Sequence, residues 1–497
     1  KEKFNNSIWL KNLGGVRCLS KQSSSLLADG QVDIKERRWY GIMEEKGQDF
    51  LVTFSLDSQE QLPQIIYKPK DFMGYLSFNN DYSKLVWIEW EYPYMPWDSS
   101  QLWLADINRE GELENINLIA GNSSLDSNQI SVFQPIWMNN GKLLVSEDSS
   151  SWWNLMITND IVKDNKLISW KHLWPMKSET AMPQWIYGMS TTSVAGQKIL
   201  SANCSNGRWK LNLLSEDGSG FEINQPFDDI SGLNVQGSRA VAIVSNSKVG
   251  SGLLELDLTS FKWTHTPANK ILISKDQISQ PEDFWFKGYL GENTHGLFYS
   301  PTNPIYSIPP LLVKIHSGPT SMARSGLNLE IQFWTSRGWA VLDVNYGGSS
   351  GFGRKYRERL KYNWGKTDVC DCVFGAEALI QTGKADKNRI AIDGGSAGGF
   401  TALLSLCEAD VFKVASCRYA VTDLIGMIKD THRFESGYLE YLIGASEENF
   451  ELYKDRSPLY KAEKINCPIV FFQGLQDKVV LPSQTERIAS ILTNKNN

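Results

Sequence analysis

The 497-residue chain has the composition of an ordinary globular protein, with 41% hydrophobic and 21% charged residues. Fifty basic residues against 56 acidic ones give a net charge of −6, which argues against a nucleic-acid-binding surface. No apolar run reaches the roughly 18–20 residues that span a bilayer, so no membrane span is expected. The length favours two domains, because one hydrophobic core rarely supports so long a chain.

The cysteines predict a reducing compartment. Their number is odd and no Cys-x-x-Cys pair occurs, so neither a disulfide framework nor a zinc site is indicated. The seven are Cys18, Cys204, Cys370, Cys372, Cys407, Cys417 and Cys467. We therefore expect no metal or cofactor and a cytoplasmic location. The N-terminus, Lys1-Glu2-Lys3-Phe4, has no apolar signal segment and no initiator Met, so we expect a processed chain or a piece of a longer one.

The first half predicts an all-β domain over residues 1–270. Fourteen of the 18 tryptophans precede residue 270, and short strand-like runs follow one another in pairs. The runs are 49–55, 85–90 with 102–107, 142–146 with 154–158, 198–203 with 210–214, and 240–244 with 253–257. They recur every roughly 40–60 residues, which is typical of a β-propeller blade. We expect a propeller that is incomplete at its N-terminus, with a pair of packed β-sheets as the alternative.

The second half predicts an α/β domain over residues 275–497, entered through the polar connector 274–283. Strand-like and helical runs now alternate, which builds a mostly parallel sheet covered by helices. The expected strands are 311–316, 339–345, 389–393, 414–421 and 469–472, and the expected helices are 327–337, 369–382, 401–407 and 483–492.

Gly394-Gly395-Ser396-Ala397-Gly398-Gly399 lies between a predicted strand and a predicted helix. A Gly-x-Ser-x-Gly turn in this context is the nucleophile elbow of an α/β-hydrolase, and Ser396 is the predicted nucleophile. The turn is so tight that neighbouring side chains must be nearly absent. The alternative is a glycine-rich turn with an incidental serine.

A serine nucleophile needs a base, and the base needs a carboxylate to orient it. In this fold the chain order is Ser, acid, His, and Asp477 is favoured over Asp423 as the acid because it follows the later strand. The five histidines are His172, His265, His295, His316 and His432, and none follows Asp477. We expect the catalytic His to lie beyond Asn497 and the chain as printed to be inactive or nearly so, with a rearranged triad through His432 as the alternative.

The backbone N–H groups of Gly318 and Ala397 are the predicted oxyanion donors. Ala397 follows the nucleophile, and Gly318 lies in the loop after an earlier strand. His316, in the same loop, is expected to shape the turn. Gly347–Gly353 does not match the dinucleotide-binding spacing and is expected to form a flexible active-site wall.

Four motifs in chain order resemble the prolyl oligopeptidase family of serine peptidases, most closely its acylaminoacyl-peptidase and dipeptidyl-peptidase-like branch. They are His316-Ser-Gly-Pro-Thr320, Asn345-Tyr-Gly-Gly-Ser-Ser-Gly-Phe-Gly-Arg354, the elbow, and Gln473-Gly-Leu-Gln-Asp-Lys-Val-Val480. The resemblance implies a propeller that caps a hydrolase domain and admits short peptides. It implies that Ser396 attacks the scissile carbonyl, Asp477 orients a His, and Gly318 and Ala397 hold the oxyanion.

The predicted function is therefore serine peptidase activity on short peptides. An esterase-type hydrolase and a non-catalytic propeller binding module are the alternatives. Short peptides are the expected partners, with neither nucleic acid nor membrane, and a homo-oligomer is left open. Acids such as Glu435 could anchor a substrate amine, but the sequence does not place them, so the choice between dipeptidyl and acylaminoacyl release stays open.

Overall fold

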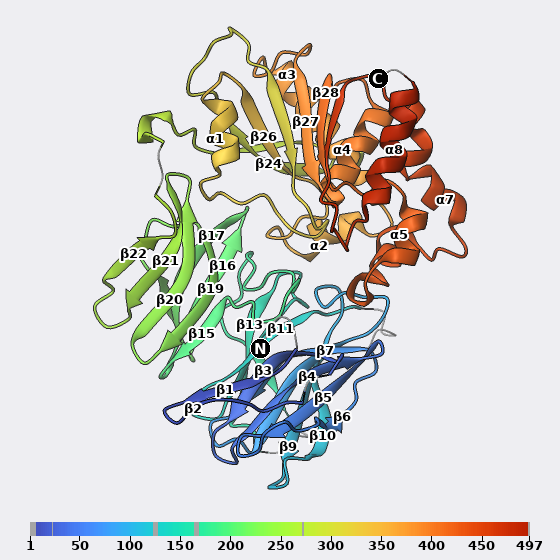
Figure 1. The fold of residues 1–497 in the computed structure, drawn as a ribbon. Coiled ribbons are helices and arrows are strands. Elements are labelled where there is room, and N and C mark those ends of the chain that lie inside the picture. The colour runs from blue at the N-terminus through green and yellow to red at the C-terminus, as the bar shows by residue number, and fades with distance from the viewer. Residues whose placement is uncertain (1–5, 22, 123–127, 164–167, 271–272, 496–497) are drawn as a thin grey trace.

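The computed structural model describes residues 6–21, 23–122, 128–163, 168–270 and 273–495. Within these ranges the chain forms a β-only body from its first half and an α/β body from its second. Figure 1 shows the α/β body stacked above the β-only body. No described helix is long and apolar enough to cross a membrane.

Five four-stranded antiparallel sheets and one hairpin make up the described part of the β-only body. The hairpin comprises β1 (Trp9–Asn12) and β2 (Gly15–Cys18). The first two sheets comprise β3 (Leu26–Asp33), β4 (Arg38–Glu45), β5 (Gln48–Ser55) and β6 (Gln64–Tyr67), then β7 (Phe72–Phe78), β8 (Lys84–Trp90), β9 (Gln101–Ile107) and β10 (Leu113–Gly121). The third comprises β11 (Val132–Trp137), β12 (Leu143–Glu147), β13 (Asn154–Thr158) and β14 (Trp170–His172). The last two comprise β15 (Thr192–Ala195), β16 (Lys198–Ser205), β17 (Arg208–Ser215) and β18 (Gly220–Glu222), then β19 (Asp229–Gln236), β20 (Arg239–Asn246), β21 (Val249–Asp257) and β22 (Trp263–Pro267).

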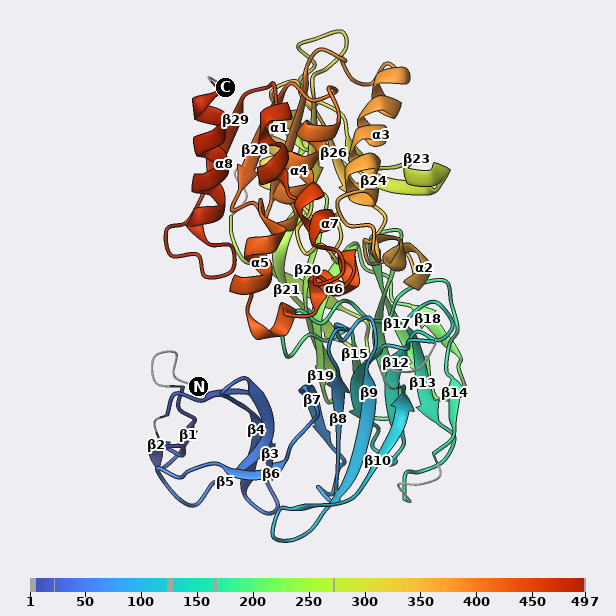
Figure 2. The same cartoon turned by 90° about the vertical axis from the view of Figure 1, so that its right-hand side faces the viewer.

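The first strand of each sheet lies beside the first strand of the next, in the series β3, β7, β11, β15, β19. Successive sheets therefore stand around a shared centre as propeller blades do, and Figure 2 shows them side by side. The predicted fold class is confirmed, and the alternative of two packed sheets is wrong. Local turn chemistry supports the blades: the β16–β17 hairpin turns at Asn206 (φ 51°) and Gly207 (φ 73°), the residue types that a two-residue turn with two positive φ angles favours.

The α/β body is built on a seven-stranded sheet. Its strands are β23 (Glu282–Lys287), β24 (Asn293–Tyr299), β25 (Leu311–Ile315), β26 (Ala340–Asn345), β27 (Ile390–Gly395), β28 (Val414–Arg418) and β29 (Ile469–Phe472). They are ordered β23-β24-β26-β25-β27-β28-β29, and all the pairs from β26 to β29 are parallel. The predicted β-α alternation is confirmed. The antiparallel strands β23 and β24 were not expected, and β23 begins inside the predicted polar connector.

Eight α-helices are found in the described part of this body. They are α1 (Leu329–Thr335), α2 (Arg354–Arg357), α3 (Thr367–Gln381), α4 (Ala397–Glu408), α5 (Leu424–Asp430), α6 (Tyr438–Ile443), α7 (Phe450–Asp455) and α8 (Pro482–Asn494). Short 3-10 turns are η1 (Lys275–Gln277), η2 (Tyr289–Gly291), η3 (Glu358–Leu360), η4 (Arg433–Glu435) and η5 (Pro458–Lys464). The segment from α5 to α7 extends toward the propeller in Figure 2, so it stands between the two bodies.

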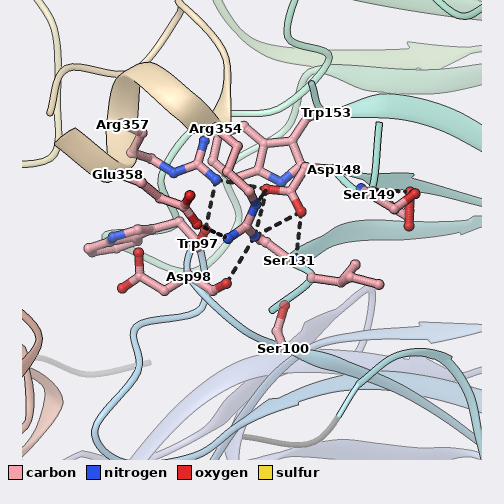
Figure 3. A network of polar contacts seen from close by, with 12 residues as sticks. Trp97, Asp98, Ser100, Ser131, Asp148, Ser149, Trp153, Arg354, Arg357 and Glu358 are labelled. Carbon is pink, nitrogen blue, oxygen red and sulfur yellow. Dashed lines mark hydrogen bonds and ion pairs between the residues drawn. The ribbon is translucent and has the colours of Figure 1, made fainter. Parts of the chain in front are cut away.

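Buried charges join the two bodies, and Figure 3 shows them from close by. The carboxylate of Asp148, after β12, accepts hydrogen bonds from Arg354 Nε at 2.8 Å and from Arg357 Nη2 at 2.7 Å. Both arginines belong to α2, and all three side chains are buried. The Arg357 guanidinium also lies 4.0 Å from the ring centroid of Trp153. Since buried charges need partners, this cluster fixes how the propeller sits on the α/β body.

The segment Gly347–Gly353 takes part in the same junction. It is buried throughout, and Gly353 N donates a hydrogen bond of 2.9 Å to Glu179 Oε1 of the propeller. Gly347 N donates at 2.7 Å to the buried carboxylate of Asp371. The expectation of a flexible active-site wall is therefore wrong, because the backbone N–H groups of this glycine-rich segment are hydrogen-bonded to buried acids.

We predict that Asp148→Ala destabilises the protein by about 3–5 kcal/mol, because it leaves two buried guanidinium groups without their shared carboxylate. The measurement is the unfolding midpoint by differential scanning calorimetry. Asp57→Ala is the matched control, since it breaks an ion pair with Arg37 in which both side chains are more than half exposed. Equal midpoints for the two variants would contradict the role assigned to the junction.

Candidate active site

Ser396 is held in a strained turn between β27 and α4. Its backbone angles are φ 52° and ψ −122°, a region that a residue with a side chain rarely adopts. The turn is fixed by hydrogen bonds from Ser396 N to Arg418 O at 2.9 Å and from Phe400 N to Ser396 O at 3.0 Å. The Ser396 hydroxyl has no hydrogen-bond partner among the described residues. The elbow geometry predicted for the nucleophile is therefore present.

The glycines around Ser396 let the strand and the helix approach each other. A Cβ on Gly394 would lie 2.2 Å from the carbonyl oxygen of Gly398, and a Cβ on Gly398 would lie 2.7 Å from Ile315 O. On the other side, a Cβ on Gly399 would lie 2.6 Å from the Cβ of Ala420. No side chain fits at these positions, so the close approach of the strand and the helix requires glycine at each of them. The alternative of a glycine-rich turn with an incidental serine is therefore not needed to explain the motif.

Ser396 opens into a narrow pocket that is lined by residues of the α/β body. Its wall brings together the predicted oxyanion donors Gly318 and Ala397 with Ser396 itself. The remaining lining is mostly apolar: Pro319, Trp364, Val421, Met427, Glu435, Tyr438, Leu439, Leu442, Val479 and Val480. Because Ala397 is the first residue of α4, its N–H has no partner within the helix and is free to meet an anion.

The loop that carries Gly318 is tied to the elbow and to α6. Ser317 Oγ donates a hydrogen bond of 2.8 Å to Gly395 O, next to Ser396. Thr320 N donates at 3.2 Å to the Tyr438 hydroxyl. Sequence reasoning did not identify Tyr438 or Trp364 as pocket residues, because they come from segments separated from Ser396 in the chain and no motif marks them.

His316 shapes this loop. Its ring stacks on Tyr346 with the ring centroids 4.3 Å apart, and Nδ1 lies 2.9 Å from Ser317 O. Nε2 lies 2.7 Å from Ser349 Oγ. A carbonyl oxygen only accepts, so Nδ1 carries the proton and Nε2 accepts from Ser349. Burial lowers the pKa of His316 to about 4, so the ring is neutral at pH 7 and both nitrogens are engaged.

The two candidate acids differ in what their carboxylates contact. Asp477 Oδ1 accepts hydrogen bonds from Val479 N at 2.9 Å and Val480 N at 3.0 Å, while Oδ2 has no hydrogen-bond partner among the described residues. Since Val479 and Val480 line the Ser396 pocket, the Asp477 loop lies at the site. Asp423 is buried, caps α5 through Ile425 N and pairs with Arg487. Both oxygens of the Asp423 carboxylate are therefore engaged in structural contacts.

No histidine of the described chain lines the Ser396 pocket. His432 pairs instead with Glu435, with 3.0 Å between Nε2 and Oε2, on the side of η4 that faces a second cavity. His295 is buried beside Asp283 and Asn345 in the sheet. Among the described residues, no group of three or more His, Cys, Asp or Glu could hold a metal ion.

The fold and the elbow together define a propeller-capped α/β-hydrolase. Comparisons with known proteins identify the family to which it belongs. A profile of the prolyl oligopeptidase family matches residues 325–497. The crystal structure of puromycin hydrolase superposes with a TM-score of 0.91 at 30% sequence identity, over 98% of this chain and 77% of that one. The chain belongs to the prolyl oligopeptidase family, as its motifs predicted.

Curated relatives match over a shorter stretch. Dipeptidyl peptidase family member 6 of Caenorhabditis elegans is 28% identical over 205 residues, which make up 40% of this chain and 28% of that protein. The acylamino-acid-releasing enzyme of Arabidopsis thaliana is 30% identical over 176 residues, 34% of this chain and 23% of that protein. The matched stretch therefore spans about a quarter of the length of these relatives.

We predict that Gly394→Ala destabilises the protein by about 1–3 kcal/mol or more, because the new methyl group meets the Gly398 backbone, which cannot move without displacing α4. The unfolding midpoint measures the effect. Gly474→Ala is the control, since a Cβ there has no atom within 4 Å. If Gly394→Ala unfolded at the same temperature as Gly474→Ala, the close approach at the elbow would be refuted.

Proposed function

We propose that the protein is a serine-type peptidase that hydrolyses short peptides through Ser396. The observation that carries the proposal is the strained elbow, which presents an unpartnered serine hydroxyl to a pocket whose wall also holds Gly318 and Ala397. Family membership supports peptide hydrolysis, and the relatives named as a dipeptidyl peptidase and an acylamino-acid-releasing enzyme support release from a peptide end.

In the proposed reaction Ser396 Oγ attacks the scissile carbonyl carbon while its proton passes to a base. The carbonyl oxygen becomes an oxyanion, which accepts hydrogen bonds from the N–H groups of Gly318 and Ala397. As the C–N bond breaks, the base returns the proton to the leaving amine, and Ser396 carries the acyl group. Water then attacks this ester with the same base, which releases the acid and restores the serine.

Asp477 is the proposed orienting acid, because its Oδ2 is unoccupied and its loop borders the pocket. The base would be a histidine that donates to this oxygen and accepts from Ser396. None of the five histidines of the chain has that position, so in our proposal the base comes from outside these 497 residues. Without it, the rate would fall by about 10⁴–10⁶-fold.

The propeller is the proposed gate. The turn η4 of the α5–α7 segment separates the Ser396 pocket, which Glu435 lines, from a cavity of about 410 Å³ whose other walls belong to the propeller. A cavity of this size admits a few residues of extended peptide and excludes a folded protein. Substrates would therefore be short peptides.

We predict that a fluorophosphonate probe labels Ser396 in a longer form of the chain that includes the proposed base, and that Ser396→Ala abolishes the labelling. The reason is that the serine oxygen attacks phosphorus and displaces fluoride while the base takes the serine proton. Mass spectrometry of the labelled peptide gives the measurement, and Ser490→Ala, which removes an exposed hydroxyl on α8, is the control. Labelling that persists in Ser396→Ala, or that is absent in every form, would contradict the proposal and favour a non-catalytic binding module.

A second assay separates the peptidase from an esterase. Peptide anilides and p-nitrophenyl esters are compared on a longer form of the chain that includes the proposed base, and the peptidase proposal requires that anilides are cleaved and that Ser396→Ala stops both reactions. Cleavage of esters alone would favour an esterase-type hydrolase.

A further inference from the structure

A cavity of about 570 Å³ lies between the last propeller blade and the sheet of the α/β body. One wall comes from the blade of β19 to β22 and includes Asp229. The opposite wall comes from β25, β26 and the connection that precedes α1, and it includes Lys314, Arg324 and Asp343. Figure 1 shows α1 above this blade. Among the described residues, none lines both this cavity and the Ser396 pocket, so the two are separate sites.

Asp343 forms part of the cavity wall and lacks a partner. The residue lies on β26 and is 5% exposed, and its Oδ1 is a buried atom without a hydrogen bond. Neither of its carboxylate oxygens takes part in an ion pair or a hydrogen bond with the described residues. A buried carboxylate is costly unless a cation or hydrogen-bond donors meet it. The uncompensated group therefore points to a cationic ligand in the cavity that it lines.

The cations of this cavity already have carboxylate partners. Lys314, on the neighbouring strand β25, has its Nζ 3.8 Å from Glu330 Oε2 of α1. Arg324 joins the two bodies, because its Nε donates a hydrogen bond of 2.6 Å to Asp229 Oδ1. Asp343 is therefore the carboxylate in this wall whose charge no described side chain pairs with.

The remaining wall suits a short hydrocarbon chain. Met322 lines the cavity, and so do Ile243 and Leu329, whose side chains stay 46% and 58% exposed. An alkylammonium group needs both surfaces, since its chain packs on apolar side chains while its charged head meets a carboxylate. A metal ion fits less well, because no group of three or more His, Cys, Asp or Glu occurs among the described residues.

We infer that this cavity binds a primary alkylammonium group, with the cation at Asp343 and the hydrocarbon chain beside Met322, Ile243 and Leu329. The ammonium donates hydrogen bonds to the carboxylate and supplies its missing counter-charge. The same group is carried by a small free amine and by the lysine side chain of a peptide, so the chemistry of recognition is shared. The inference does not depend on the proposed role of Ser396, because the two sites share no wall.

Saturation-transfer NMR on the full chain at pH 7.5 tests the binding. The probes are n-butylamine and the peptide acetyl-Gly-Lys-Gly amide, both protonated because such amines have a pKa of about 10.4. We expect dissociation constants on the order of 1 mM and mutual competition. 1-Butanol, which has the same chain without the charge, is expected to show no saturable binding. Binding of one amine alone would support the site and identify the source of the ligand; binding of neither would overturn the inference.

Asp343→Asn is expected to weaken amine binding by at least about tenfold, because the carboxamide carries no charge. The unfolding midpoint without amine is expected to stay equal or to rise, since a buried unpaired charge is removed. Asp257→Asn, an exposed change of the same charge at the end of β21, is the control. Amine binding that Asp343→Asn leaves unchanged would contradict the assignment.

Ser251→Phe provides a second variant that leaves Asp343 in place. Ser251 is exposed and lines the cavity from the propeller side, so the larger side chain occupies part of the space for the ligand. We expect it to weaken the binding of both amines while the unfolding midpoint stays near that of the parent chain. If Asp343→Asn does not fold, this variant decides, and undiminished binding in it would overturn the inference.

The pH profile gives a readout that a purely structural carboxylate would not produce. Burial raises the pKa of Asp343 to about 6, although Lys314 lowers it, and Glu330 and Asp393 raise it further. Because the ammonium binds the ionised carboxylate, amine affinity is expected to fall as the pH drops through about 6 and to level off above pH 7. A flat profile from pH 5 to pH 7.5 would contradict the role of Asp343.

The other groups that face Asp343 do not produce this decline. Burial lowers the pKa of His316, which lines the same cavity, to about 4, so its ring is neutral throughout. Burial and the charge of Asp343 raise the pKa of Tyr299 on β24, so its hydroxyl is neutral as well. Arg324 and Asp229 neutralise each other. The predicted fall in amine affinity therefore reports on Asp343.

Discussion

The close approach of β27 and α4 is the constraint on which the site depends. Gly394 and Gly398 lie so near each other that neither position tolerates a side chain, and the backbone of Ser396 must adopt a positive φ to connect the strand to the helix. This geometry lifts the Ser396 hydroxyl out of the sheet, and the Ala397 N–H, at the start of α4, has no partner within that helix. The proposed nucleophile and one proposed oxyanion donor therefore arise from a single turn.

The second constraint acts between the bodies. Asp148 holds two arginines of α2, and the propeller aromatic rings hold Phe434. The aromatic contacts hold η4 beside the propeller, and Glu435 of the same turn lines the Ser396 pocket. In the proposed function, specificity at Ser396 would then depend partly on propeller residues that never touch the substrate.

The sequence predicted the parts of the site that depend on local backbone geometry. The glycines of the elbow and of the blade hairpins fit only a few types of turn, so these turns could be predicted from the sequence. The alternation of strand-like and helical runs predicted the parallel sheet. Glu435, Tyr438 and Trp364 could not be placed, because they reach Ser396 through long-range packing that has no local signature. The Gly347–Gly353 segment was misread as flexible for a related reason: its glycines bring backbone N–H groups close to the buried acids Asp371 and Glu179, which lie far away in the sequence.

The central claim is that the elbow places the scissile carbonyl of a peptide at Ser396 and between two backbone N–H groups. A crystal structure of Ser396→Ala with a bound tetrapeptide tests it most directly. The account predicts a peptide carbonyl oxygen within hydrogen-bond distance of the N–H groups of Gly318 and residue 397. A peptide bound with no carbonyl near those two N–H groups would contradict it.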